Sequence, residues 1–398
     1  MRLTKALLLS AAIVLLTAPA FATDVKIGVL NDRSGVYADL SGEGSVIAAK
    51  MAIADFDAAK KGINVTVVSA DHQNKPDIAS NIARQWYDQD GVDAIFDVPT
   101  SSAALAVSQV TREKNKVFID SGAGSTAIVG KSCSPNTILW TYDTYALANG
   151  TARTLLAQGK KSWFFITADY AFGQALEHDT TDIVKNLGGT VLGDAKYPFP
   201  GSDFSSYLLQ AQASKADVIG LANAGGDTVN TMKQAAEFGI AQGGQSLAAL
   251  LVFITDVNAM GLDTAKGLLV TSAFYWDQNQ GTRDFAKRFA ALDNGKMPTM
   301  VQAGVYASVL DYLKAVDATK GKDSKAVLAW MKSNPTDDPL FGKGSILPNG
   351  RVLHDMYLYQ VKTPAESKGP WDYYKLVATI PAAEAFQTVA QSGCQLAK

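Results

Sequence analysis

Three consecutive hydroxyl residues stand where this chain could bind an anion. Thr100, Ser101 and Ser102 follow the apolar run DAIFDV and begin a helical pattern. At the start of a helix, hydroxyls and free backbone N–H groups together can bind a negatively charged group. The same residues could simply cap their helix, and a cap and an anion site are compatible. We therefore expect a carboxylate site that needs no lysine or arginine.

A glycine-rich loop follows the next apolar run and could bring backbone N–H groups close to a ligand. Its candidate ligand-binding residues are Gly122, Gly124 and Ser125. The segment also fits the dinucleotide fingerprint G-x-G-x-x-A, with Asp143 further on. However, the motif opens the fourth strand–helix unit, and the stretch after it contains Gly130 instead of a clean helix. A dinucleotide-dependent enzyme is therefore a remote alternative.

Aromatic side chains follow several other apolar runs, at positions where they could stack against a flat ring. The candidates are Tyr37, Tyr170, Phe172, Phe253, Tyr275 and Trp276. Each of them alone could be a core residue, but we do not expect all of them to be core. Polar and glycine residues of the same loops complete the candidate site: Asp39, Asp169, Asn223, Gly225 and Asp227.

Two series of short apolar runs position these loops. The first series has runs at 25–30, 64–70, 93–98 and 116–120, alternating with helical patterns at 43–60, 75–89 and 102–114. The second series has runs at 162–168, 188–193, 216–222, 250–255 and 267–272. Continuous apolar strands separated by helices indicate a parallel sheet covered on both faces. The sequence therefore predicts two doubly wound α/β lobes, with ligands bound beyond the carboxyl ends of the strands.

The first 22 residues are typical of an export signal. Arg2 and Lys5 precede an apolar stretch at 6–16, and Ala20-Phe21-Ala22 fits an A-x-A cleavage site. Cleavage after Ala22 would place the protein in the periplasm, without ATP or NAD. It would leave 376 residues (398 less 22), enough for two domains.

Charge and cysteine content narrow the classes of partner. Without Arg2 and Lys5, the 36 basic side chains become 34 and face 38 acidic ones. No basic stripe is present, so nucleic acid is not an expected partner. Cys133 and Cys394 lie in polar, loop-like sequence and could form a disulfide in an oxidising compartment. The three histidines have no metal-ligand spacing, and no metal or other cofactor is expected.

The loops together resemble those of a known family. KIGVLNDRSGVYADLSGEG, DVPTSS, SGAGST and DYAFGQAL are similar, in order and spacing, to loops of the periplasmic solute-binding proteins of ABC importers. The match is to the type I fold of the branched-chain amino-acid binding family, over essentially the whole mature chain. The resemblance implies a monomeric protein, not an enzyme, whose two lobes close around one small molecule. It also implies delivery of that molecule to a membrane ABC permease.

The resemblance further implies that three crossover strands join the lobes. We expect the crossovers near Tyr142, Phe274 and Leu353. The expected divisions are residues 23–142 plus 275–352 for lobe one, 143–274 plus 353–380 for lobe two, and 381–398 for a tail that returns to lobe one.

One departure from the amino-acid binders bears on the ligand. Those proteins place an acidic residue after a strand of the second lobe, where it pairs with the ligand's ammonium group. Here LLVFIT puts Val252 or Phe253 at that point, and an unpaired buried ammonium costs several kcal/mol. The segment AFYWD followed by a T-R pair resembles the branch that imports aromatic acids. We expect a hydroxybenzoate or phenylpropenoate; because Asp169 or Asp227 could still pair with an ammonium, a branched-chain or other amino acid is the alternative.

Overall fold

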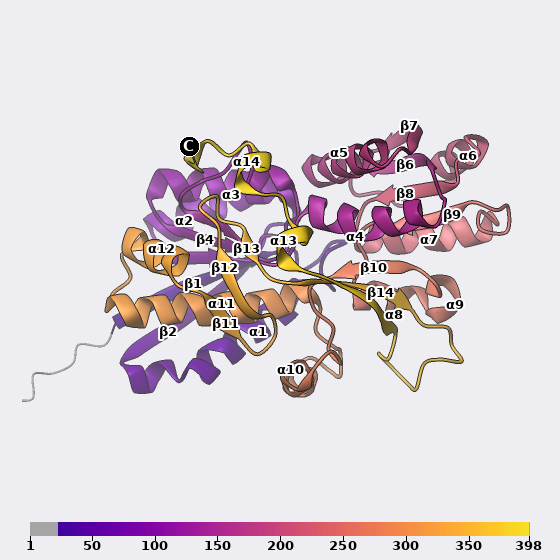
Figure 1. The fold of residues 1–398 in the computed structure, drawn as a ribbon. Coiled ribbons are helices and arrows are strands. Elements are labelled where there is room, and N and C mark those ends of the chain that lie inside the picture. Colours follow the sequence, from indigo (N-terminus) through magenta and orange to yellow (C-terminus); the bar gives the residue numbers. More distant parts are fainter. Residues whose placement is uncertain (1–22, 398) are drawn as a thin grey trace, which may run out of the picture.

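Two parallel β-sheets organise the molecule, one in each of two α/β lobes (Figure 1). The computed structural model describes residues 23–397. The expected export signal therefore lies outside the described residues. Within them, no helix is both long enough and apolar enough to span a bilayer.

The first lobe is built on a five-stranded sheet with the order β2-β1-β3-β4-β5. Its strands are β1 (Thr23–Asn31), β2 (Ile63–Asp71), β3 (Ala94–Phe96), β4 (Val117–Asp120) and β5 (Thr137–Leu139). The connections include α1 (Gly42–Phe56), η1 (Ala58–Lys61), α2 (Pro76–Asp88), α3 (Ser101–Lys114) and η2 (Thr126–Ile128). The central strands β3 and β4 are buried throughout, as their continuous apolar sequences predict.

The second lobe repeats this arrangement with the order β7-β6-β8-β9. Its strands are β6 (Ser162–Ala168), β7 (Thr190–Tyr197), β8 (Val218–Ala222) and β9 (Ser246–Ala249). Its helices are α4 (Thr144–Ala157), α5 (Ala171–Asn186), α6 (Ser205–Ala213), α7 (Gly226–Glu237), α8 (Ile254–Met260) and α9 (Leu262–Ala265). All neighbouring strands of both sheets run parallel, so their carboxyl ends meet at one edge of each sheet.

The rest of the chain adds two small antiparallel sheets and three further helices of at least ten residues. The sheet β10-β14-β15 consists of β10 (Leu269–Ser272), β14 (Met356–Val361) and β15 (Tyr374–Ile380), and the other of β11 (Thr336–Asp338), β12 (Gly342–Ile346) and β13 (Val352–Leu353). The helices are α10 (Gln280–Leu292), α11 (Met300–Thr319) and α12 (Ser324–Ser333). Helix α11 packs against α1 and α12, and Figure 1 shows it on the side of the first sheet.

Local sequence explains the bounds of α11. The hydroxyl of Thr299 accepts the N–H of Gln302, and the Gln302 side chain accepts the N–H of Thr299 in return. This capping box satisfies two donors that the first turn leaves free. The helix ends at Thr319, and the C-cap residue Lys320 has a left-handed φ of 53°.

Two sequence-based predictions about elements are wrong. The run 250–255 is not a strand: β9 ends at Ala249, and the apolar residues after it form a buried connection into α8. The apolar composition of this connection resembles that of a buried strand. A short apolar run has no periodicity by which a strand could be told from a buried loop. The run 267–272, expected with the second parallel sheet, contains β10, which instead pairs antiparallel with β14. After residue 361 the chain forms β15 and the short elements α13 (Ala382–Ala385), α14 (Val389–Ser392) and η3 (Gln395–Ala397).

The predicted disulfide is confirmed. Cys133 and Cys394 are bonded, with 5.7 Å between their Cα atoms. The bond ties the end of the chain to the loop between β4 and β5 of the first lobe. The residue bounds expected for the lobes stay a prediction.

Candidate functional site

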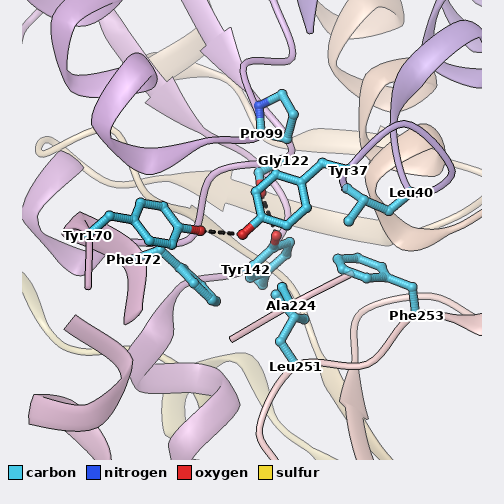
Figure 2. A pocket seen from close by; sticks show the side chains of 10 residues that line it. All are labelled: Tyr37, Leu40, Pro99, Gly122, Tyr142, Tyr170, Phe172, Ala224, Leu251 and Phe253. Carbon is cyan, nitrogen blue, oxygen red and sulfur yellow. Dashed lines mark hydrogen bonds between the residues drawn. The ribbon is translucent and has the colours of Figure 1, made fainter. Parts of the chain in front are cut away.

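A pocket lies where the carboxyl ends of the two sheets face each other, and we call it the cleft pocket. Its lining residues are Tyr37, Leu40, Pro99, Gly122, Tyr142, Tyr170, Phe172, Ala224, Leu251 and Phe253 (Figure 2). The space open to the centre of a water molecule is about 10 Å³, roughly enough for one water. The lobes are therefore closed in this conformation, and the aromatic rings fill most of the space between them.

Every lining residue follows a strand of one of the two parallel sheets. Residues after β1, β3, β4 and β5 enter from the first lobe, and residues after β6, β8 and β9 enter from the second. This is the edge at which ligands bind in open parallel sheets. Among the described residues, no Asp, Glu, Lys or Arg side chain lines the cleft pocket.

Two tyrosines meet across the cleft pocket. The hydroxyls of Tyr37 from the first lobe and Tyr170 from the second are hydrogen-bonded, and Figure 2 shows the two rings pointing toward each other. Phe199 stacks on both rings, with centroid distances of 5.4 Å to Tyr37 and 4.2 Å to Tyr170. Burial is the largest cause that raises the pKa of each tyrosine, so both hydroxyls are neutral at physiological pH.

The glycine-rich loop forms the wall of the pocket against Tyr142. The Tyr142 hydroxyl donates a hydrogen bond to the carbonyl of Gly122. A Cβ at Gly124 would come within 2.7 Å of the Tyr142 ring and 2.9 Å of the Phe172 ring. A side chain at this position would therefore push aromatic residues out of place.

The start of α3 lies beside this wall and has a specific hydrogen-bond pattern. The Thr100 hydroxyl donates to Oδ1 of Asn74. Oγ of Ser101 accepts the N–H groups of Gly124 and Ser125, at 3.3 and 3.2 Å. These two N–H groups, expected to face a ligand, are thus bonded to Ser101. The hydroxyl proton of Ser101 is not used in these bonds.

Two buried carboxyl groups lie behind the pocket wall. Oδ1 of Asp120 accepts the N–H groups of Val98, Gly122 and Ala123, so it fixes two pocket loops at once. Burial, with the charge of Asp97 adding to it, raises the pKa of Asp120 to about 7. Burial also raises the pKa of Asp97 to about 6. The pair therefore holds protons at a pH where ordinary carboxyl groups are ionised.

Several candidate residues do not line the pocket. Asp39 and Asp169 are exposed, and they pair with Lys296 and Gln174 respectively. Ser102 is half-buried in the first turn of α3. The amide of Asn223 bonds to threonine hydroxyls of α7.

Two aromatic candidates face another part of the molecule. The Tyr275 hydroxyl and the Trp276 indole N–H both donate to the carbonyl of Trp371, at 3.2 and 2.7 Å. Tyr275 also packs against Tyr359 and Tyr374 of the antiparallel sheet. These contacts come from chain nearly 100 residues away, which a local motif does not reveal.

The start of α7 brings Gly225 and Asp227 close to the first lobe. The N–H of Gly226 donates to the carbonyl of Val36, at 3.0 Å. Asp227 is buried, and its Oδ2 accepts the Tyr197 hydroxyl at 2.8 Å. Its Oδ1 has no hydrogen-bond partner among residues 23–397, and burial raises the pKa of the group to about 6.

Five lining residues were not among the candidates. They are Leu40, Pro99, Tyr142, Ala224 and Leu251. All five follow parallel strands, and this position can be read from the sequence. Most of them, however, have apolar side chains, which do not distinguish a pocket residue from a core residue. Elsewhere in the part of the chain that the structure describes, no cluster of three or more His, Cys, Asp or Glu side chains could hold a metal ion.

The chain is similar to known binding proteins over nearly its whole length. A periplasmic binding protein from Burkholderia mallei is 51% identical, with a TM-score of 0.92 over 94% of this chain and 100% of that chain. A branched chain amino acid ABC transporter periplasmic ligand-binding protein from Burkholderia xenovorans is 42% identical, with a TM-score of 0.83 and the same coverage of both chains.

More distant relatives share the fold. A solute-binding protein of an ABC transporter from R. palustris, in complex with benzoate, is 21% identical, with a TM-score of 0.81 over 94% of this chain and 99% of that chain. Among curated proteins, none matches the chain. The profile of the family described as periplasmic binding protein matches residues 24–370. The chain therefore belongs to the periplasmic binding protein family, as a solute-binding protein of an ABC transporter with the two-lobe type I fold.

Proposed function

We propose that this protein captures a small aromatic carboxylate, of the hydroxybenzoate or phenylpropenoate type, between its lobes. The observation that carries the proposal is the lining of the cleft pocket. Five aromatic rings enter it from both lobes, and among the described residues no charged side chain lines it. Such a surface favours a flat apolar ring, which can stack or meet the rings edge to face.

The start of α3 supports binding of the carboxylate. Pro99 lines the pocket, and the first turn of α3 follows it directly. Because Oγ of Ser101 already accepts two N–H groups, its own O–H can donate to an anion. A helix of 14 residues adds favourable potential at its N-terminus. The Thr100 hydroxyl has a different role, since its proton goes to Asn74.

An amino acid is the second candidate ligand, and one observation favours it. The free Oδ1 of the buried Asp227 could accept an ammonium group if the pocket opened toward α7. The 42% identical relative is described as a branched chain amino acid ABC transporter periplasmic ligand-binding protein. In this conformation, however, Asp227 does not line the cleft pocket.

The family also supports a proposal about partners and location. A protein of this family hands its ligand to a membrane permease, and we propose that this chain does so as a monomer. We propose that residues 1–22 direct it to the periplasm and are removed after Ala22.

A thermal-shift panel tests the ligand class. Benzoate, 4-hydroxybenzoate, cinnamate, leucine and valine are added separately to the mature protein. Because a ligand that binds only the native state raises its Tm, the aromatic acids should raise it and the amino acids should not. Calorimetric titration should then give one site per chain. Micromolar binding of leucine or valine without binding of the aromatic acids would establish the amino-acid alternative instead.

A further inference from the structure

Asn74 occupies a position that joins three loops of the first lobe. It lies after β2, half-buried, and outside the lining of the cleft pocket. Its φ of 57° is left-handed, and its N–H donates to Nδ1 of His72 at 2.9 Å. The side chain is thereby directed toward the loops after β1 and β3.

The side-chain amide uses both of its ends. Nδ2 donates to Oδ2 of Asp32, at 2.6 Å, and Oδ1 accepts the hydroxyl of Thr100. Asp32 is fully buried and in turn accepts the N–H of Tyr37, at 2.8 Å. Thr100 is also fully buried and follows Pro99 directly. One side chain thus connects two walls of the cleft pocket, Tyr37 and Pro99.

We propose that Asn74 is a positioning residue for the cleft pocket: it holds the Tyr37 wall and the Pro99 wall at a fixed separation without touching the ligand. The amide is suited to this role because its Nδ2 donates to Asp32 and its Oδ1 accepts from Thr100. A carboxylate would repel Asp32, and an apolar side chain would remove one hydrogen bond from Asp32 and the side-chain acceptor of the Thr100 hydroxyl. The inference deepens the proposed function and rests on it only for the identity of the ligand.

The first test removes the side chain while keeping the backbone conformation. Asn74→Gly retains easy access to a left-handed φ. Hydrogen exchange of the ligand-free protein should become faster in two segments, 33–40 and 97–102. Asn115→Gly is the matched control, because Asn115 is also left-handed, with φ 48°, and its side chain bonds to Asn136 at the far end of α3. The control should leave both segments unchanged.

The second readout is affinity, measured by titration of benzoate, 4-hydroxybenzoate and leucine. Asn74→Gly should weaken binding of whichever compound binds the wild type by about tenfold, as expected for losing two hydrogen bonds. Unchanged exchange in the two segments, or an unchanged dissociation constant, would overturn the proposal. If none of the compounds binds the wild type, the proposed function fails, and the exchange result alone decides the role of Asn74.

A conservative variant distinguishes positioning from a general structural role. Asn74→Asp keeps the size of the side chain but places a carboxyl group against Asp32 and Thr100. Asp71 and His72 are the other titratable groups of this turn, and they accept the backbone N–H groups of Gln73 and Asn74. At about pH 5 the new group can be protonated and donate as the amide does, whereas at about pH 8 it is ionised. Binding should therefore recover toward wild type at the lower pH. An equal loss at both pH values would count against the proposal.

Discussion

Phe253 shows how a single side chain can determine the chemistry of the cleft pocket. It is 2% exposed, and its ring meets Tyr142 edge to face at 6.3 Å. It also begins α8, where its N–H donates to Asp256. An acidic side chain at this position would be buried beside aromatic rings and near the carboxyl group of Asp256. Burial raises the pKa of Asp256 to about 7.

Phe253→Glu should therefore abolish binding of an aromatic acid, because two buried carboxylates would repel each other. Phe253→Leu is the control: it keeps an apolar surface and should cost about 1 kcal/mol of binding energy for the lost ring contact. Calorimetric titration with benzoate measures both. Wild-type affinity in Phe253→Glu would show that the ring does not contact the ligand.

Asp120 makes the stability of the protein depend on pH. Its pKa rises from the ordinary 3.8 to about 7, chiefly by burial, so the folded protein binds more protons than the unfolded chain in this interval. This contribution is favourable at low pH and is lost as the pH rises through about 7. Asp120→Asn keeps an oxygen for the three N–H groups and removes the titration.

As the pH rises, the free energy of unfolding should therefore fall less steeply in Asp120→Asn than in the wild type. The two slopes should differ by up to about 1.4 kcal/mol per pH unit. Urea unfolding at several pH values between about 4 and 7 measures the slope. Asp182→Asn, at a side chain that is 60% exposed, is the control and should follow the wild type. Identical slopes for Asp120→Asn and wild type would mean that Asp120 is ionised throughout.

The sequence predicts which loops reach the pocket better than it predicts which of their side chains point into it. Tyr37, Tyr170 and Phe253 line the pocket as aromatic residues that follow strands. Trp276 also follows a strand, but its indole N–H points to the carbonyl of Trp371. The direction of a loop side chain depends on partners that only the folded chain brings near. For the same reason, the pairing of Ser101 with Gly124 could not be predicted.

At the scale of elements, the C-terminal segment connects distant parts of the fold. β15 pairs with β14, and the chain then runs past α4, where Nδ2 of Asn149 donates to the carbonyl of Glu384 at 2.7 Å. The ring of Phe386 lies 4.6 Å from the guanidinium of the buried Arg351. The segment ends at the disulfide to the first lobe.

Removing the disulfide should destabilise the protein. It links residues 261 positions apart, and a bond across so long a loop restricts the unfolded chain strongly. The double variant Cys133→Ser, Cys394→Ser should lose about 2–4 kcal/mol of unfolding free energy. Urea unfolding of the oxidised wild type and the variant measures this. If the double variant is also less stable than the reduced wild type, the serine substitutions and not the missing bond cause the loss.

Helices and strands were predictable where the periodicity of apolar residues in the sequence matches the face that the structure buries. The helix expected at 102–114 matches α3, which begins after Thr100 and ends before Asn115, a residue with a left-handed φ of 48°. The strand expected at 250–255 is wrong because apolar residues of a buried loop look like a short strand. β15 was not predicted because only its first residue is buried, so its sequence lacks the apolar pattern of a core strand.

At the scale of the whole molecule, the two lobes touch through the loops around the pocket. Backbone meets backbone where the N–H of Gly226 in the second lobe donates to the carbonyl of Val36 in the first, at 3.0 Å. A Cβ on Gly225 would lie 2.5 Å from the carbonyl oxygen of Val36. The glycine is therefore needed for the closed arrangement as well as for its own φ of 57°.

Gly225→Ala should act as a wedge that holds the lobes apart. Ligand binding that requires closure should weaken by at least tenfold, about 1.4 kcal/mol, because the methyl group and the Val36 carbonyl cannot both keep their positions. Small-angle scattering with saturating benzoate should show compaction of the wild type and little compaction of the variant. Gly244→Ala is the matched control, since Gly244 also has a positive φ, 95°, but nothing lies within 4 Å of its added Cβ. The control should suffer the same kind of backbone strain and still close around the ligand. If Gly225→Ala binds and compacts like Gly244→Ala, the contact between Val36 and the α7 turn is not part of the closed, ligand-bound state.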